Sequence, residues 1–184
     1  MTWLIVLLAI VLAVFLLLVA LYNRLVRHRN RCDNAWAQVE VQLKRRWDLI
    51  PNLVETVKGY AAHERGVFDE VTEARAAAQH ARTPADTAQA EGILGQALGR
   101  LFAVAEAYPE LQADENFRQL QSQLAETENR IAVSREVYND SVLTYNNAIQ
   151  TFPGVAFAGP FGFTVREFFE VEEAAQQEAP VVGF

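Results

Sequence analysis

An unbroken apolar run near the N-terminus is the clearest pattern in the chain. From position 3 to position 22 no residue is charged, and fifteen of these twenty residues are Leu, Ile, Val or Phe. Twenty helical residues extend about 30 Å, the thickness of a bilayer's hydrocarbon core. At about −0.3 to −0.6 kcal/mol per residue, the fifteen contribute about −5 to −9 kcal/mol to membrane insertion. The pattern predicts a transmembrane anchor over residues 1–23, with Trp3 and Tyr22 at its two membrane–water interfaces.

Two other interpretations of this run are a buried core helix and a cleaved signal peptide. A soluble helix of this length would show a polar face. A signal peptide would have a basic segment before a shorter apolar run and small residues before the cleavage site. Only Met1 and Thr2 precede the run, and no convincing small-residue site follows it. We therefore expect an uncleaved anchor.

Four arginines follow the apolar run directly: Arg24, Arg27, Arg29 and Arg31. No acidic residue interrupts them before Asp33. By the positive-inside rule, this asymmetry predicts that the C-terminal part of the chain is cytoplasmic. At the bilayer surface, each arginine would also attract anionic lipids by about 1 kcal/mol.

Residues 24–151 show helical periodicity, which predicts a helical bundle. Apolar residues first recur at the a and d positions of a heptad, with Arg46 as the polar exception: Trp36, Val39, Leu43, Ile50, Leu53, Val57 and Tyr60. Pro51 interrupts this stretch, because it removes the hydrogen bond to the carbonyl of Trp47. Either a long helix kinks there, or Asp48 caps a new helix after a reversal of the chain.

Two further helices are predicted from their ends and their periodicity. Thr83 and Pro84 suit the N-cap and first turn of a helix that buries Leu94, Ala97, Leu101, Val104 and Tyr108 and ends at Pro109. Another helix, over residues 115–150, repeats large residues every seven positions: Phe117, Leu124, Ile131, Tyr138 and Tyr145. The positions between them are mostly polar or small, which favours a multi-helix bundle over a two-stranded coiled coil. The expected fold class is therefore all-α, a transmembrane helix followed by an antiparallel up-and-down bundle of three or four long helices.

The composition changes at position 152. Five Gly or Pro residues within 152–163 argue against regular helix there. We expect residues 152–171 to form a Phe/Gly/Pro-rich loop with one short element near its end, and residues 172–184 to form an acidic, mobile tail. Phe157, Phe161 and Phe163 leave two alternatives: they cover the open end of the bundle, or they form an exposed patch that contacts a membrane or a partner.

Charge and side-chain chemistry argue against several classes of function. The net charge of −7 combines an excess of four basic residues over residues 22–60 with an excess of eleven acidic residues beyond them, which does not suit a nucleic-acid binder. None of the three His follows an acidic residue at the spacing of di-iron bundles, and motifs of zinc proteases and serine hydrolases are absent from the sequence. The single Cys excludes a disulfide framework. We expect no catalytic residue, no cofactor, no metal site and no nucleic-acid partner.

One polar cluster stands out within the heptad pattern: Lys44, Arg45, Arg46, Asp48 and Glu55. Because Arg46 occupies a core-type position, its guanidinium needs acceptors, for which Asp48, Glu55, Glu126 and Glu128 are the candidates. The cluster is either a structural ion-pair network that sets the register of the bundle, or a contact for a partner or a lipid headgroup.

The chain resembles the LemA family along nearly its whole length. The motifs are Tyr22-Asn23, Ala35-Trp36, Val39 to Arg46, Asp48 to Tyr60, Tyr108-Pro109-Glu110-Leu111, Thr127 to Ile131, Tyr145-Asn146, Phe152-Pro153 and Pro180 to Phe184. The resemblance implies a single-span bacterial membrane protein with an antiparallel helical bundle and no known enzymatic activity. In this family, one relative takes part in building magnetosome membranes, and others appear beside envelope-stress components. The chain departs from the family at Trp47, where a polar residue is usual, and at Cys32, where a small aliphatic residue is common.

These observations lead to one functional expectation and one alternative. We expect a non-enzymatic scaffold, anchored in the bacterial inner membrane, that forms homo-oligomers and recruits membrane proteins that the sequence does not identify. The alternative is a protein that binds and remodels lipid directly through the basic juxtamembrane residues and the Phe-rich loop.

Overall fold

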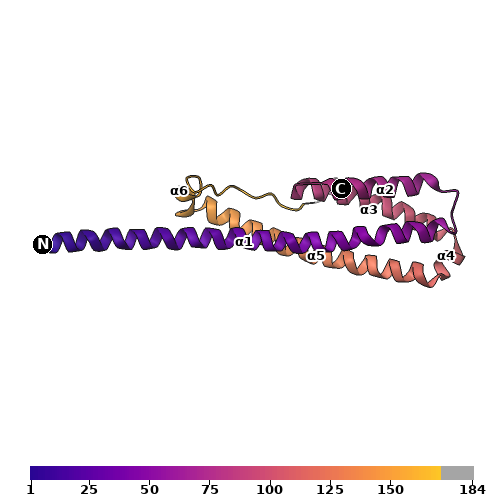
Figure 1. Cartoon of the computed structure of the whole chain (residues 1–184), viewed down its shortest axis with the longest axis horizontal. Coiled ribbons are helices and arrows are strands. Elements are labelled where there is room, and N and C mark those ends of the chain that lie inside the picture. Colours follow the sequence, from indigo (N-terminus) through magenta and orange to yellow (C-terminus); the bar gives the residue numbers. More distant parts are fainter. Residues whose placement is uncertain (171–184) are drawn as a thin grey trace, which may run out of the picture. The chain divides into compact units, whose positions relative to one another are not determined.

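The structure, a computed structural model, describes residues 1–170, and all regular secondary structure in that range is helical (Figure 1). The six helices are α1 (Thr2–Lys58), α2 (Arg65–His80), α3 (Pro84–Glu106), α4 (Pro109–Ala113), α5 (Glu115–Gln150) and α6 (Gly154–Ala158). The predicted all-α class is confirmed. The tail predicted over residues 172–184 lies outside the described residues.

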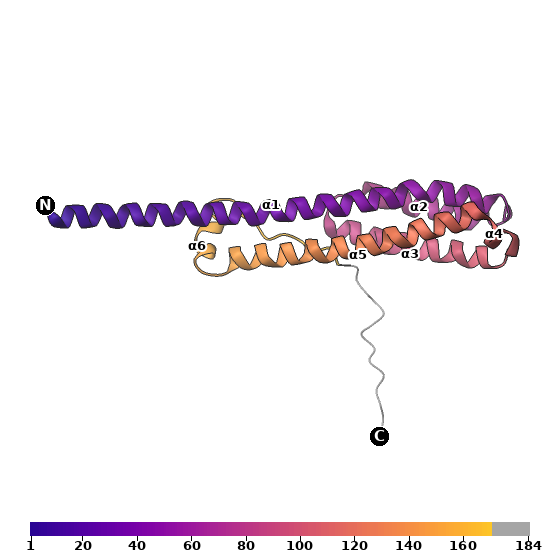
Figure 2. The same cartoon turned by 90° about the horizontal axis from the view of Figure 1, so that it is seen from below.

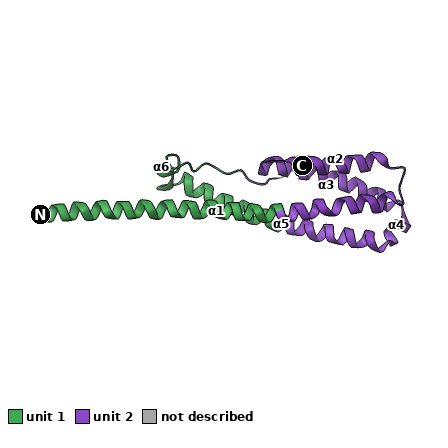
Figure 3. Ribbon diagram, viewed as in Figure 1, with its two compact units in different colours: residues 1–40, 133–166 green, residues 41–132, 167–184 purple. Residues whose placement is uncertain are grey.

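The chain divides into two compact units, coloured separately in Figure 3. Of the described residues, unit 1 contains 1–40 and 133–166, and unit 2 contains 41–132 and 167–170. The two longest helices, α1 and α5, contribute residues to both units.

Helix α1 continues through Pro51, so the chain does not reverse there. Asp48 therefore lies within a helix and is not an N-cap. The carbonyl of Trp47, which a proline at position 51 leaves without its helical donor, accepts a hydrogen bond from Arg75 Nε of α2 at 2.7 Å. A side chain from a neighbouring helix thus replaces the backbone bond that Pro51 removes.

Unit 2 is a bundle of four helical segments, formed by the end of α1, by α2, by α3 and by the first half of α5 (Figure 2). The end of α1 and helix α2 run in opposite directions, since Lys58 lies over the ring of Phe68 while Trp47 contacts Arg75. The core is apolar and draws on all four segments: Ile50, Leu53, Val57, Phe68, Val71, Leu94, Ala97, Leu101, Phe117 and Leu124. Tyr60, predicted to be in the core, is exposed because α1 ends at Lys58.

The local signals for α3 and α5 were informative. Thr83 Oγ1 accepts a hydrogen bond from the backbone N–H of Asp86 at 3.1 Å, which caps α3 as predicted. Helix α3 ends at Glu106, and Pro109 begins the short helix α4. Near this end of α3, Ala105 is buried. Val104 and Tyr108, which were predicted to be buried, are half-buried. Helix α5 has the predicted limits, and the five large residues of its heptad repeat are buried.

Unit 1 consists of an exposed apolar helix followed by a two-helix pair. The apolar side chains of the first 17 residues are not covered by the described chain, so this run is not the core helix of a soluble domain. Beyond it, α1 and α5 pack antiparallel, with the rings of Trp36 and Tyr138 5.1 Å apart. The buried residues of the pair include Leu25, Cys32, Ala35, Val39, Val142, Tyr145 and Ile149.

The segment after α5 differs from the prediction in two places. Residues 154–158 form the short helix α6 although helix was not expected there, because Gly154 and Pro153 lie at its start, where both are tolerated. Conversely, the described residues 164–170 have no regular secondary structure, so the short element expected there is absent from them.

Candidate functional site

A buried polar network in unit 2 centres on Arg46, whose residue is 9% exposed. Its Nη1 lies 3.0 Å from Glu91 Oε2 of α3 and 3.0 Å from Glu128 Oε2 of α5. The other oxygen of Glu91 accepts a hydrogen bond from Trp47 Nε1 at 2.6 Å. Both oxygens of the buried carboxylate are therefore paired, which offsets part of the cost of removing its charge from water.

Burial dominates the electrostatics of Glu91. It raises the pKa of the Glu91 carboxyl above its usual range, while the charge of Arg46 and the hydrogen bond from Trp47 oppose that rise. The guanidinium also packs against the backbone of α3, because a Cβ at Gly95 would lie 3.8 Å from Arg46 Nη2. The network thus joins three helices through one cation and two carboxylates.

The structure separates the five residues predicted as one polar cluster. Lys44 pairs with Asp48 at 3.2 Å, and Glu55 pairs with Lys58 at 3.2 Å, both on the exposed side of α1. These pairs join neighbouring turns of one helix and contribute little to stability. Arg45 is also exposed, so only Arg46 of the five points into the bundle.

The partners of Arg46 were predicted in part. Glu128 was among the candidates, but Glu126 pairs with Arg130 instead. Glu91 was missed, although it lies three residues before Leu94 and therefore on the buried face of α3. An acid and a base, each on an otherwise apolar helix face, were the signal that could have identified the pair.

Trp47 is part of this network. Its indole N–H donates to Glu91 and its carbonyl accepts from Arg75. The side chain is half-buried, so it supplies a polar donor together with apolar packing area. Arg75, which the sequence analysis did not single out, belongs to the same set of contacts.

The Phe-rich segment of unit 1 packs beside Tyr22, at the end of the apolar run. The ring of Tyr22 lies 5.5 Å from that of Phe161 and 5.7 Å from that of Phe163, both edge-on. Arg29 lies over the ring of Phe163 at 5.5 Å. The segment therefore returns to the level of the predicted membrane interface.

Of the two alternatives for these phenylalanines, the exposed patch is wrong for Phe163, which is buried because it packs between Tyr22 and Arg29. Phe157 is half-buried, and Phe161 is 55% exposed. Phe152, which was not predicted to be part of the patch, is 85% exposed. One phenylalanine thus covers the helix pair while two others project from it.

Three of the juxtamembrane arginines, Arg24, Arg27 and Arg31, are exposed, while Arg29 is half-buried over the ring of Phe163. Among residues 1–170 no carboxylate lies within ion-pair distance of Arg24, Arg27, Arg29 or Arg31. Partial burial, together with the charges of Arg24, Arg31 and Arg27, lowers the pKa of His28. This surface is therefore cationic and suited to anionic groups.

The end of unit 1 is held by a side-chain clamp. Asn146 accepts from the backbone N–H of Arg166 and donates to its carbonyl, both at 2.9 Å. The guanidinium of Arg166 in turn donates to Asp33 at 2.7 Å. Burial raises the pKa of the neighbouring Cys32 thiol, which favours its inert, protonated form.

In the described part of the chain, no group of three or more His, Cys, Asp or Glu side chains is placed to hold a metal ion. The buried charges of unit 2 are paired with one another. Their arrangement connects helices, and we find no chemistry in it beyond structural stabilisation.

Fold and surface together define a membrane-associated, all-α protein whose apolar N-terminal helix is long enough to cross a bilayer. The chain belongs to the LemA family, whose sequence pattern matches residues 35–184. This confirms the resemblance inferred from the motifs.

Named relatives include magnetosome proteins. The chain is 29% identical to magnetosome protein MamQ 2 of Paramagnetospirillum magneticum, over 88% of this chain and 68% of that protein. It is equally similar, over the same shares, to magnetosome protein MamQ of Magnetospirillum gryphiswaldense. Protein LemA of Metamycoplasma hominis is 23% identical, over 71% of this chain and 60% of that protein. None of these names denotes an enzyme.

Proposed function

We propose that the protein is a non-enzymatic scaffold in a bacterial inner membrane, with its C-terminal part in the cytoplasm. The apolar helix supplies the anchor, and the four arginines after it support the cytoplasmic orientation. Similarity to magnetosome proteins supports a role in organising membranes. The bundle would form homo-oligomers and recruit other membrane proteins.

Exposed apolar residues on α5 support self-association. In unit 1, helix α5 leaves Val133 62% and Val137 46% exposed. These valines are one turn apart and form an apolar strip. Because the anchor confines all copies to one plane, weak contacts through this strip would suffice for assembly.

Mass photometry of the full chain in detergent, over a concentration series, tests the scaffold proposal. We expect species larger than a monomer, and we expect the double substitution V133E/V137E to shift them towards monomer because charges would be buried at the contact. The matched control is V41E/I93E, which places two charges on exposed apolar positions of unit 2. A monomer at every concentration of the unsubstituted chain would contradict the proposal.

Direct lipid remodelling is the second candidate, favoured by the exposed Phe152 and Phe161 beside the cationic surface. If these rings insert between lipids, F152S/F161S should weaken the deformation of liposomes that contain the full chain. Electron microscopy of the liposomes measures this, with V165S as a control at another exposed apolar position. Equal deformation by both variants would remove this candidate.

A further inference from the structure

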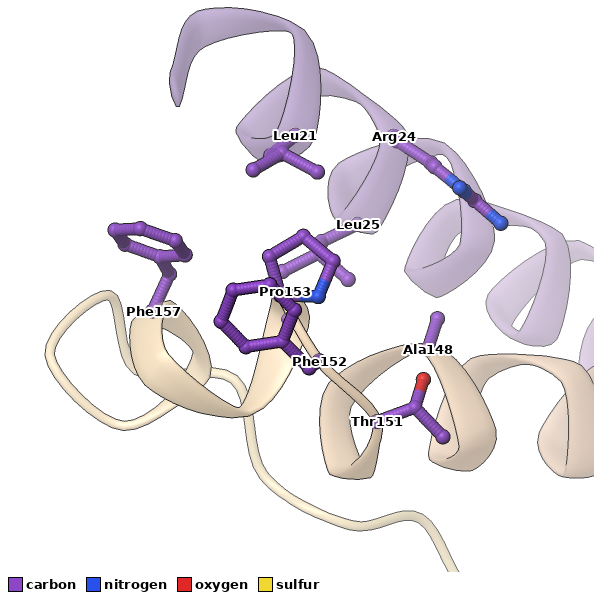
Figure 4. Close-up of a pocket in the computed structure, with 9 residues that line it drawn as sticks. Leu21, Arg24, Leu25, Ala148, Thr151, Phe152, Pro153 and Phe157 are labelled. Carbon is purple, nitrogen blue, oxygen red and sulfur yellow. The ribbon is translucent and has the colours of Figure 1, made fainter. Parts of the chain in front are cut away.

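A small cavity opens in unit 1 where α1 leaves its apolar run (Figure 4). Its volume is about 110 Å³. Helix α1 lines it with Leu21, Arg24 and Leu25, and the end of α5, the turn after it and α6 line it with Ala148, Thr151 and Phe157. It lies entirely within one unit and does not overlap the polar network around Arg46.

The cavity is apolar at one end and cationic at the other. Leu21 faces Phe157 across it, while Arg24 extends along α1 on the side of Ala148 (Figure 4). Thr151 supplies a hydroxyl, whose proton is donated to the carbonyl of Asn147 and whose oxygen can still accept. No carboxylate is among the lining residues.

The cavity lies at the point along α1 where the hydrocarbon core of a bilayer would meet the lipid headgroups. Leu21 belongs to the apolar run, and Tyr22 follows as the aromatic residue of the interface. Arg24 lies three residues beyond Leu21, about 4.5 Å along the helix axis. A lipid in the same bilayer would therefore present its first methylenes to the apolar end and its phosphate to Arg24.

The charges favour an anionic lipid over a zwitterionic one. Arg24 has no carboxylate partner among residues 1–170, so its guanidinium can donate two parallel hydrogen bonds to a phosphate. The ammonium of a zwitterionic headgroup would find no carboxylate in the lining. The cavity is also smaller than the usual pocket for a free ligand, which suits part of a molecule that the bilayer already holds.

We propose that this cavity binds an anionic phospholipid, with the phosphate at Arg24 and the start of an acyl chain between Leu21 and Phe157. The proposal rests on the second candidate function, lipid binding, and does not require self-association. It assigns one defined lipid site within the cationic surface.

Native mass spectrometry of the full chain, released from detergent micelles, tests the site. We expect phosphatidylglycerol to be retained at concentrations where phosphatidylcholine is not. R24Q should weaken phosphatidylglycerol binding by about tenfold, since it removes a charged hydrogen bond. R27Q, which makes the same change of charge outside the lining, is the matched control. Equal losses in the two variants would overturn the proposal, because they would show diffuse attraction and no site.

Two uncharged substitutions test the cavity itself. A148L should fill the cavity and weaken lipid binding without changing any charge. Circular dichroism shows whether A148L folds. If it does not, T151L replaces it, because it fills the cavity from an exposed position. Unchanged binding by the folded variant would overturn the proposal. Inorganic phosphate is the other source of the same anion, and its displacement of the lipid at millimolar concentration would also overturn it. Oligomers in the same spectra report on the scaffold separately.

Discussion

At the scale of single residues, the ion pair between Arg46 and Glu91 connects α1 with α3, and Glu128 adds α5 to the same network. Burying one partner without the other would leave an uncompensated charge in the core, which costs several kcal/mol. A chain with apolar residues of similar volume in place of the pair would be as stable. The pair therefore contributes mainly to the register of the helices, which is the structural role considered for the cluster. That role remains our hypothesis.

The raised pKa of Glu91 predicts a specific pH dependence. Below the usual carboxyl pKa of about 4.3, folded and unfolded chains both hold the proton, and burial of Glu91 has no charge penalty. As the pH rises towards the higher pKa of the folded state, the unfolded chain releases its proton first, so the free energy of unfolding falls. The folded chain should therefore lose stability relative to E91Q as the pH rises from about 4.3, the usual carboxyl pKa, towards the raised pKa of Glu91 in the folded chain.

Urea unfolding, followed by tryptophan fluorescence over this pH range, measures the difference between the two proteins. Gln at position 91 keeps an acceptor for Trp47. The variant E126Q is the control, because it removes a carboxylate from an exposed ion pair with Arg130 on α5 and leaves Glu91 and both of its neighbouring charges in place. A difference between the chain with Glu91 and E91Q that does not change with pH would contradict the prediction.

At the scale of secondary structure, most limits could be predicted and the effect of Pro51 could not. Thr83 identifies the start of α3, and the repeat from Phe117 to Tyr145 identifies α5, because caps and periodicity are local signals. Whether a helix continues through a proline depends on a donor from elsewhere. Arg75 supplies it from α2, 24 residues later in the chain, and no local pattern shows this.

The contact between Arg75 and Trp47 predicts coupling with Pro51. Loss of the donor in R75M would leave the Trp47 carbonyl without its partner and should lower the free energy of unfolding by about 1–3 kcal/mol. In P51A the backbone regains an N–H at position 51 that can pair with that carbonyl, so R75M should then cost clearly less.

A double-mutant cycle of urea unfolding measures this coupling. The control is R100M, which removes the partner of Glu70 on α2 without involving α1. Equal costs of R75M in the chain with Pro51 and in P51A would show that the contact does not compensate for the proline.

The same limit applies to the candidate sites. Arg46 was recognisable because it breaks an apolar heptad, but its partner on α3 could be found only from the way the helices pack. Likewise, Phe163 and Phe161 have the same residue type and similar sequence surroundings. Both rings contact Tyr22, but only Phe163 also lies under Arg29, and Phe163 is buried while Phe161 is exposed.

At the scale of the whole molecule, the apolar run of α1 determines membrane association. Its fifteen large aliphatic and Phe residues favour insertion by about 5–9 kcal/mol, and one arginine at a helix centre opposes it by about 2.5–3.5 kcal/mol. The double substitution L12R/L16R should therefore cancel most of the insertion free energy.

Carbonate extraction of membranes from cells that express the full chain measures the effect. We expect the chain to remain with the membrane and L12R/L16R to appear largely in the soluble fraction. L12I/L16I is the control, since it keeps the apolar surface. Retention of the arginine variant in the membrane would mean that contacts outside the run hold the protein there.

Finally, helix α1 has no break between the apolar run and the buried positions of unit 1. The rotation of the one part about the helix axis therefore fixes the rotation of the other. Each helical residue turns the chain by about 100°, so the side of α1 that faces lipid is rigidly keyed to the side on which Leu25 and Cys32 pack. One residue inserted after Asn23 would rotate the two sides against each other by about a quarter turn, whereas seven would nearly restore them. If lipid contacts rotated the anchor about its axis, the first packed residues of α1 would rotate with it, because no break in the helix separates the two parts.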